Sequence, residues 1–254
     1  MEFPAASAES FALADGVVAL APGLAWLPQS RCILVADTHL AYEDVVGAAL
    51  PLWSTADIVA TLSMVAARAA AREIVFLGDI VHGAQMSEGA MRSVAAALDT
   101  LRADYELTLV AGNHEGRSRA LRVIGATVEA CERDGWLLVH GDRTPVLGRR
   151  AIIGHLHPSF YLAAHSSAPA FVASETLVVV PALTPYSPGL DVFSGSFAEA
   201  IGRYDLRSRD VHVVVATRER VYPFGTLAAL REALRPPAAP APQRYRRRRL
   251  GADR

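Results

Sequence analysis

Short apolar runs that each end in a cluster of polar residues dominate the first two thirds of the sequence. Five such runs have the length and composition of buried β-strands, and helical stretches separate the first three of them. An alternation of strand and helix predicts an α/β protein. The predicted strands are Arg31–Ala36, Glu73–Leu77, Glu106–Ala111, Trp136–Val139 and Ala151–Ile153, and the predicted helices are Thr55–Arg72 and Met86–Arg102.

The pattern changes after His157, where short β-like runs are separated by loops rich in Pro, Gly and Ser. This part of the chain favours antiparallel strands. Near the start of the chain, a Pro-Gly pair between two apolar runs predicts a hairpin. The further predicted elements are strands at Val17–Leu20, Leu24–Leu27, Ala170–Val172, Thr176–Val180 and Val211–Val215, and a last helix at Gly225–Leu234.

We expect a single domain over residues 1–234, because a chain of 254 residues can bury one substantial core. Residues 235–254 are rich in Pro and Arg, and five of the arginines cluster at Arg244 and Arg246 to Arg249. Such a composition predicts a disordered, solvated tail. Its positive charge leaves open a contact with nucleic acid, which binds basic segments independently of sequence.

Composition narrows the class of protein further. Apolar residues make up 52% of the chain, which is typical of a globular protein. Apolar stretches such as Thr176–Ala182 are far shorter than the roughly 20 residues of a transmembrane helix. The first residues lack the basic and apolar regions of a signal peptide, so we expect a cytoplasmic protein. Two cysteines are too few for a cysteine-based zinc site.

Polar clusters follow all five predicted strands. In an open α/β sheet the carboxyl ends of strands converge on one crevice, so we expect these side chains to meet. A single histidine is more often a hydrogen-bonded core or surface residue, but six of the eight histidines here follow predicted strands. The clusters are Asp37-Thr38-His39, Gly78-Asp79 with His82, Gly112-Asn113-His114-Glu115, His140-Gly141-Asp142 and Gly154-His155-Leu156-His157.

These residue types predict a metal centre. Carboxylate, imidazole and amide ligands suit Mn²⁺, Fe²⁺ or Zn²⁺ better than Ca²⁺. Seven candidates exceed what one ion accepts while it keeps a position open for water and substrate, so we expect two divalent ions. Asp79 is the candidate for the carboxylate that bridges them. The candidate ligands are Asp37, His39, Asp79, Asn113, His140, His155 and His157.

Four further residues are candidates for substrate contacts. Arg117 and Arg119 follow His114, and a guanidinium matches the geometry of a phosphate group. Both could equally be surface charges. His82 and Arg143 lie beside predicted ligands, where they would either contact substrate or serve a structural role.

In this order, the motifs D-x-H, G-D-x-x-H, G-N-H-E, H-G-D and G-H-L-H resemble those of the calcineurin-like metallophosphoesterase family. The resemblance implies a four-layer α/β/β/α sandwich of two mixed sheets flanked by helices. It also implies that Asp37, His39 and His157 hold one metal, that Asn113, His140 and His155 hold the other, and that Asp79 bridges them. His114 would be the catalytic histidine, and a metal-activated water would attack the phosphoester without a covalent intermediate.

A finer resemblance extends over about Val17 to Asp191. The segments V-A-D-T-H-L-A-Y-E, Gly78 to His82, Gly154 to Pro158 and Val179 to Ala182 are similar to a bacterial and archaeal branch that includes ligase-associated DNA damage response endonucleases. This branch implies Mn²⁺-dependent hydrolysis of phosphodiesters, in single-stranded DNA or RNA, and a role in DNA repair. The chain departs from the branch at Tyr42-Glu43, where a basic residue often follows the first motif.

Other functions remain open at this stage. One is a phosphatase or cyclic-nucleotide phosphodiesterase that acts on small molecules. Another is a non-catalytic module that binds nucleic acid, although a complete set of ligands argues against it. Outside its tail the chain has no obvious basic stripe, and it has no RNP-type aromatic motif for stacking bases. The pattern does not predict an oligomeric state.

Overall fold

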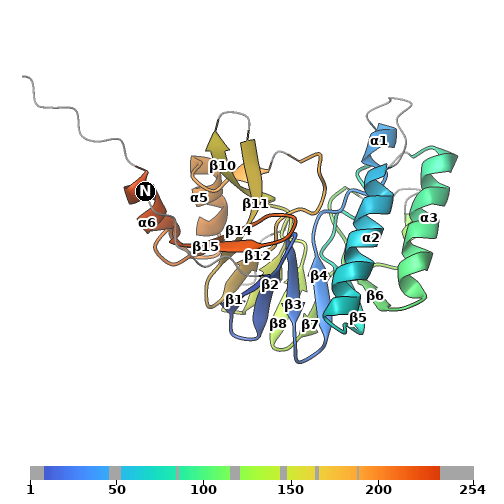
Figure 1. Ribbon diagram of the computed structural model, residues 1–254, viewed down its shortest axis with the longest axis horizontal. Helices are drawn as coiled ribbons and strands as arrows, with labels where there is room; N and C mark the ends of the chain where they lie inside the picture. Colours follow the sequence, from blue (N-terminus) through green and yellow to red (C-terminus); the bar gives the residue numbers. More distant parts are fainter. Residues whose placement is uncertain are drawn as a thin grey trace, which may run out of the picture.

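Two β-sheets lie face to face in the computed structural model, with helices against both outer sides (Figure 1). The structure describes residues 9–45, 53–83, 86–114, 121–143, 148–163, 166–187 and 189–234. The predicted tail at 235–254 lies outside the described residues. In the described part of the chain, no helix has both the length and the hydrophobicity that a membrane span needs.

The first sheet is built from the first half of the chain and has six strands. Its first four strands are antiparallel neighbours, and the last three run parallel. In spatial order the strands are β1 (Ser10–Ala14), β2 (Val17–Leu20), β3 (Leu24–Leu27), β4 (Cys32–Val35), β5 (Glu73–Phe76) and β6 (Glu106–Leu109).

The second sheet has nine strands and is also mixed. Along its main path lie β13 (Leu190–Asp191), β10 (Pro158–Ala163), β11 (Ser166–Ala173), β12 (Leu177–Val179), β9 (Ala151–Ile153), β8 (Trp136–Val139) and β7 (Cys131–Arg133). Off this path, β14 (His212–Ala216) pairs with β11, and β15 (Val221–Thr226) pairs with β14. The antiparallel pairing expected after His157 holds for β10, β11, β14 and β15, but β12 runs parallel with β9.

Six helices complete the described part of the chain. Helices α2 and α3 cover the outer face of the first sheet, and α5 and α6 lie on the side of the second (Figure 1). The helices are α1 (Tyr42–Val45), α2 (Trp53–Arg68), α3 (Glu88–Arg102), α4 (Leu121–Ile124), α5 (Gly195–Gly202) and α6 (Leu227–Ala233). The molecule is thus the four-layer α/β/β/α sandwich that the sequence predicted.

Alternation along the strands explains the three apolar cores of this sandwich. In β4, Ile33 packs toward the helices while Leu34 packs toward the second sheet. In β9, Ile152 faces the first sheet and Ile153 faces α5 and α6. Successive strand residues point to opposite faces, so a strand that is covered on both sides must be apolar throughout. This is why the runs in the sequence are continuous and not alternating.

Several predicted boundaries differ from the observed ones for local reasons. The strands β4, β5 and β6 end one or two residues early, because the chain turns there into the site. Helix α2 ends at Arg68, and Ala70 adopts φ 51° in the turn that follows it. Gly225 belongs to β15, so the last helix begins at Leu227, where the Thr226 side chain accepts a hydrogen bond from the Ala229 N–H.

The expectation of one crevice at the edge of a single open sheet is wrong. Strands β4, β5 and β6 belong to the first sheet, whereas β8 and β9 belong to the second. The segment after β4 nevertheless meets those after β12 and β9, because Ala36 forms a parallel bridge with Ala182 and the His155 N–H donates to Asp37. The polar clusters therefore meet where the two sheets join.

Candidate metal centre

Asp37 lies at the centre of the polar clusters and is completely buried. Its Oδ2 atom accepts a hydrogen bond of 2.9 Å from the His155 N–H, which comes from the other sheet. Its Oδ1 atom is buried and has no hydrogen-bond partner among the described residues, although His157 Nε2 lies 3.2 Å away. A buried carboxylate oxygen without a donor is costly unless a cation or water satisfies it. The position fits a metal ligand.

Asp79 occupies the corresponding place after β5 and is 2% exposed. Its Oδ1 atom accepts a hydrogen bond of 2.9 Å from the His114 N–H. Its Oδ2 atom lies 3.4 Å from His140 Nε2 and 3.7 Å from His114 Nε2. The carboxylate thus joins the cluster after β6 to the cluster after β8.

The side chains form three compact groups of potential metal donors, and one of them, His39, His82 and His114, shares His39 with another group. Within each group the donor atoms lie within 4.8 Å of one another. The other two groups are Asp37, His39 and His157, and Asp79, His140 and His155. Asn113 adjoins the last of these groups, since its Oδ1 atom is 2.9 Å from His140 Nε2. All seven predicted ligands therefore lie close together.

Hydrogen bonds determine which ring nitrogen three of the histidines offer. The Nδ1 atom of His140 lies 2.8 Å from the Leu77 carbonyl, and that of His114 lies 3.0 Å from the His82 carbonyl. A carbonyl only accepts, so both Nδ1 atoms donate and the Nε2 atoms are directed elsewhere. His157 Nδ1 is likewise engaged, at 2.7 Å from Ser187 Oγ. Such partners are typical of the residues that orient metal ligands.

Burial and charge shift the pKa values of this cluster strongly. Burial lowers the pKa of His39 to about 4, so its imidazole is neutral near pH 7. Burial also lowers the pKa of His155, with His140 adding to the effect. Burial would raise the pKa of Asp79, but the His140 hydrogen bond and charge lower it to about 2. Burial would lower the pKa of His140, yet Asp79 and Asp37 raise it to about 9. The low pKa of Asp79 means that its carboxylate is ionised near pH 7 and attracts a cation.

Two glycines allow the close approaches in this site. A Cβ atom on Gly78 would lie 2.5 Å from His140 Nδ1, and one on Gly154 would lie 2.7 Å from Asp37 Oδ2. Neither position has room for a side chain, so the glycines at these strand ends have a packing reason in addition to turn formation.

The four candidates for substrate contacts fall in different places. His82 belongs to the cluster, where its Nδ1 atom is 3.1 Å from His39 Nδ1 and its ring stacks on His114. Arg143 forms an ion pair with Glu129, a surface carboxylate outside the cluster, and is 71% exposed. Arg117 and Arg119 lie outside the described residues.

Sequence patterns do not point to several residues that line this site. Ser187 orients His157, and Tyr42, Glu43 and Tyr186 form a connected group beside His82. In the sequence, Tyr42 and Glu43 stand out only as a departure from the related branch. Ser187 and Tyr186 lie in a loop after β12 that carries no periodic signal.

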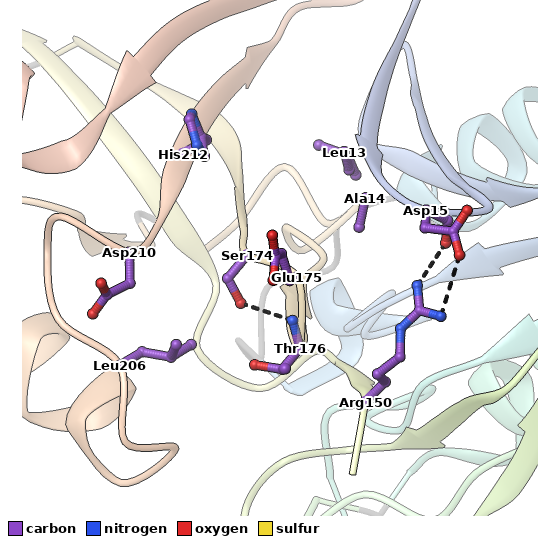
Figure 2. Close-up of a pocket in the computed structure, with 10 residues that line it drawn as sticks. All are labelled: Leu13, Ala14, Asp15, Arg150, Ser174, Glu175, Thr176, Leu206, Asp210 and His212. Atoms are coloured by element: carbon purple, nitrogen blue, oxygen red, sulfur yellow. Dashed lines mark hydrogen bonds and ion pairs between the residues drawn. The ribbon is translucent and has the colours of Figure 1, made fainter. Parts of the chain in front are cut away.

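One cavity adjoins the site and another lies away from it. A groove of about 660 Å³ is lined by His157, Ser187, residues of α2 and Arg218. Figure 2 shows a second cavity, of about 800 Å³, at the amino ends of β9 and β12. There Arg150 points toward Asp15, to which it is hydrogen bonded, and lies 4.1 Å from the centre of the Trp136 ring. No predicted site residue lines this second cavity.

Comparison with known proteins gives the family of the chain. Residues 30–168 match the calcineurin-like phosphoesterase family. Among solved structures, the chain is similar to the nuclease MPE of Pseudomonas putida, with a TM-score of 0.62, 22% identity, and coverage of 82% of this chain and 94% of that chain. A phosphoesterase of E. coli, Yfce, has a TM-score of 0.35 at 15% identity, covering 65% of this chain and 83% of its own.

The chain has no match among the curated proteins. The family match covers more than half of the chain and includes the segments after all five strands that carry the candidate ligands. This chain is a member of the calcineurin-like phosphoesterase family.

Proposed function

We propose that this protein is a phosphodiesterase that depends on two divalent metal ions and hydrolyses its substrate with metal-activated water. The observation that carries the proposal is the buried Asp37 Oδ1 atom, which has no hydrogen-bond partner among the described residues and lies within a group of nitrogen and oxygen donors. Asp37, His39 and His157 would hold one ion, and Asn113, His140 and His155 the other. Asp79 would bridge them. The mixed donors suit Mn²⁺, with Fe²⁺ and Zn²⁺ as alternatives.

When bound, such a pair of ions lowers the pKa of a shared water and neutralises charge on the phosphoryl oxygens. The residues of the chain supply the remaining requirements. His114 is 36% exposed, so its ring is accessible from outside the cluster. Because its Nδ1–H is held by the His82 carbonyl, its Nε2 atom is the one available to the leaving oxygen or to the phosphate. His114 is therefore assigned the role of catalytic histidine.

Single-stranded nucleic acid is the phosphodiester that we propose as substrate, within DNA repair. The fold is shared with a protein described as a nuclease, and the branch resemblance implies the same substrate class. A nuclease must accept a long chain on either side of the scissile phosphate. The groove that leaves the site at His157 offers space for one side of such a chain.

The test is hydrolysis by metal-stripped protein, with and without added Mn²⁺. The substrates are bis-p-nitrophenyl phosphate and a labelled single-stranded oligonucleotide. Cleavage of both only in the presence of metal is the expected result. Cleavage of the chromogenic diester alone would favour a small-molecule phosphodiesterase. Cleavage of neither substrate would contradict the proposal.

A further inference from the structure

Two tyrosines from distant parts of the chain stack at the rim of the metal centre. The rings of Tyr42, at the start of α1, and Tyr186, in the loop after β12, have centroids 4.9 Å apart and planes only 15° apart. Offset stacking of this kind stabilises aromatic pairs by a small amount beyond the area they bury. Tyr186 is nevertheless 42% exposed. Tyr42 covers one face of its ring.

A buried carboxylate keeps the Tyr186 ring in this orientation. The Tyr186 hydroxyl donates a hydrogen bond of 3.0 Å to Glu43 Oε1, and the Ser54 N–H donates another of 3.0 Å to the same atom. Glu43 is only 2% exposed. Its burial would raise its pKa, but these hydrogen bonds lower it below the ordinary value, so the carboxylate is ionised near pH 7 and accepts both. A fixed ring loses little entropy when a ligand stacks on it.

Two chains of contacts connect this pair to the proposed machinery. On one side, the edge of Tyr42 meets His82 with ring centroids 4.4 Å apart, and His82 stacks on His114 at 4.7 Å. On the other side, Ser187, the neighbour of Tyr186, is hydrogen bonded to His157. The Tyr186 ring is thus connected to His114 through Tyr42 and His82, and its chain neighbour Ser187 contacts His157. The groove from His157 also passes Ser54 and Ser187.

We propose that Tyr186, supported by Tyr42 and held by Glu43, is a platform on which a nucleobase beside the scissile phosphate stacks. This inference rests on the proposed function and specifies how the site would select nucleic acid over other phosphodiesters. Stacking is tolerant of sequence because every base has an aromatic face. It also needs no basic stripe, which agrees with the near-zero net charge of the chain. Tyr186 is then a specificity-determining residue, and Glu43 is a positioning residue.

The test compares two single strands that differ only in their bases. One is a fluorescein-labelled oligothymidylate with phosphorothioate linkages, which resist hydrolysis, and the other is its abasic counterpart of equal length and charge. Binding of the full-length protein in Mn²⁺ is followed by fluorescence anisotropy. Wild-type protein is expected to bind the strand with bases about tenfold more tightly, which is the contribution of roughly one stacked base. Equal affinity for the two strands, or binding of neither, would overturn the proposal.

Variants assign this preference to the ring. Tyr186→Ala should lose the tenfold difference by weakening the binding of oligothymidylate alone, whereas Tyr186→Phe should retain most of it. Phe11→Ala is the matched control, because it removes a ring that is 37% exposed on the edge strand β1. An undiminished preference in Tyr186→Ala would also overturn the proposal. If that variant does not fold, the Tyr186→Phe variant and the comparison of strands in wild type still decide.

This proposal and the proposed function fail in different ways. If the protein hydrolyses phosphodiesters with metal but binds the two strands equally well, the proposed function holds and the role of Tyr186 as a stacking platform is wrong. If the protein prefers the strand with bases but hydrolyses no phosphodiester with any of the metals, the stacking platform holds and the proposed function is wrong.

Discussion

Five of the proposed metal ligands have a backbone conformation that side chains rarely adopt. The φ angles are 50° at Asp37, 43° at His39, 48° at Asp79, 61° at His155 and 42° at His157. Each such residue costs on the order of 1–3 kcal/mol, and the conformation persists only where surrounding contacts impose it. The main-chain bonds from the His39 N–H to the Asp79 carbonyl and from the Asp37 N–H to the Gly78 carbonyl are part of that framework.

Substitution of His114 separates catalysis from metal binding. His114→Ala should lower kcat by about 10²- to 10⁴-fold, which is the usual contribution of a general acid, while metal content stays near that of wild type. The measurement is steady-state hydrolysis of bis-p-nitrophenyl phosphate together with metal analysis of the same sample. His212→Ala, which removes an exposed histidine at the start of β14, is the control and should behave as wild type. An unchanged kcat in His114→Ala would refute the assignment.

Substitution of Asp79 should affect metal binding as well as hydrolysis, unlike substitution of His114. Asp79→Ala removes the proposed bridge and leaves His140 without the carboxylate that lies 3.4 Å from its Nε2 atom. We expect loss of bound metal, by a factor of at least about 10 in affinity, and loss of hydrolysis with it. Metal analysis after dialysis against a weak chelator provides the measurement. A variant that retains two ions per chain would show that Asp79 does not bridge.

At the residue scale, the candidate ligands could be identified from the sequence, but the residues that contact and orient the site could not. Residues such as Asp37 and Asp79 were identifiable because each directly follows an apolar strand. Tyr186 and Ser187 were not, because their partners are more than a hundred and about thirty residues away and no local pattern records such pairings. Arg143 was predicted near substrate on proximity to His140 alone, and it pairs with Glu129.

At the scale of elements, the turn after β5 transmits backbone geometry directly to the site. Gly78 has φ 87°, and a Cβ atom there would lie 2.5 Å from the His140 ring. Gly78→Ala should therefore displace His140 and lower metal affinity. A positive φ alone costs an alanine roughly 1–2 kcal/mol, and the contact with His140 should add to this loss of stability. Metal content and chemical denaturation measure the two effects.

Gly135→Ala is the matched control for that substitution. Gly135 has a similar φ of 77° in the turn between β7 and β8, but nothing lies within 4 Å of the position that a Cβ atom would take there. The variant should show the conformational cost alone, with metal content retained. Equal effects of the two substitutions would mean that the contact with His140 is unimportant.

The elements themselves were largely predictable, whereas their distribution between two sheets was not deduced from the strand pattern. Strands β2, β3, β8 and β9 have the predicted bounds, because each is a continuous apolar run closed by turn residues. Strands β5 and β9 lie in different sheets but share one burial pattern, since both are covered on both faces. Only the family resemblance implied two sheets.

At the scale of the whole molecule, a largely buried ion pair joins the two sheets at the end of β5 opposite to the metal centre. Arg133 on β7 donates two hydrogen bonds to Glu73 on β5, and the Thr108 hydroxyl donates a third. Burial would raise the pKa of Glu73, but the Arg133 and Thr108 hydrogen bonds lower it below 4.5. The ionised form therefore stabilises the fold, fully so above the unfolded-state pKa, and this contribution is lost as the pH falls through the lower folded-state value.

Glu73→Gln should lower the free energy of unfolding by about 2 kcal/mol near pH 7. The difference from wild type should shrink as the pH falls below about 4.5, the ordinary pKa of glutamate. Urea denaturation of the metal-free proteins at a series of pH values provides the measurement. Glu132→Gln, which breaks an exposed pair with Arg149, should change stability by less than about 1 kcal/mol. A difference that does not vary with pH would contradict the role given to Glu73.

The division of the site between two sheets has a consequence for how the enzyme is made. Asp37, His39, Asp79 and Asn113 are synthesised before any of His140, His155 and His157 leaves the ribosome. On the proposed ligand set, a nascent or truncated chain carries both carboxylates but lacks the histidines that complete either metal position. If the proposed function holds, such a chain could not cut nucleic acid, including the message that encodes it, until the second sheet has been translated and has docked on the first.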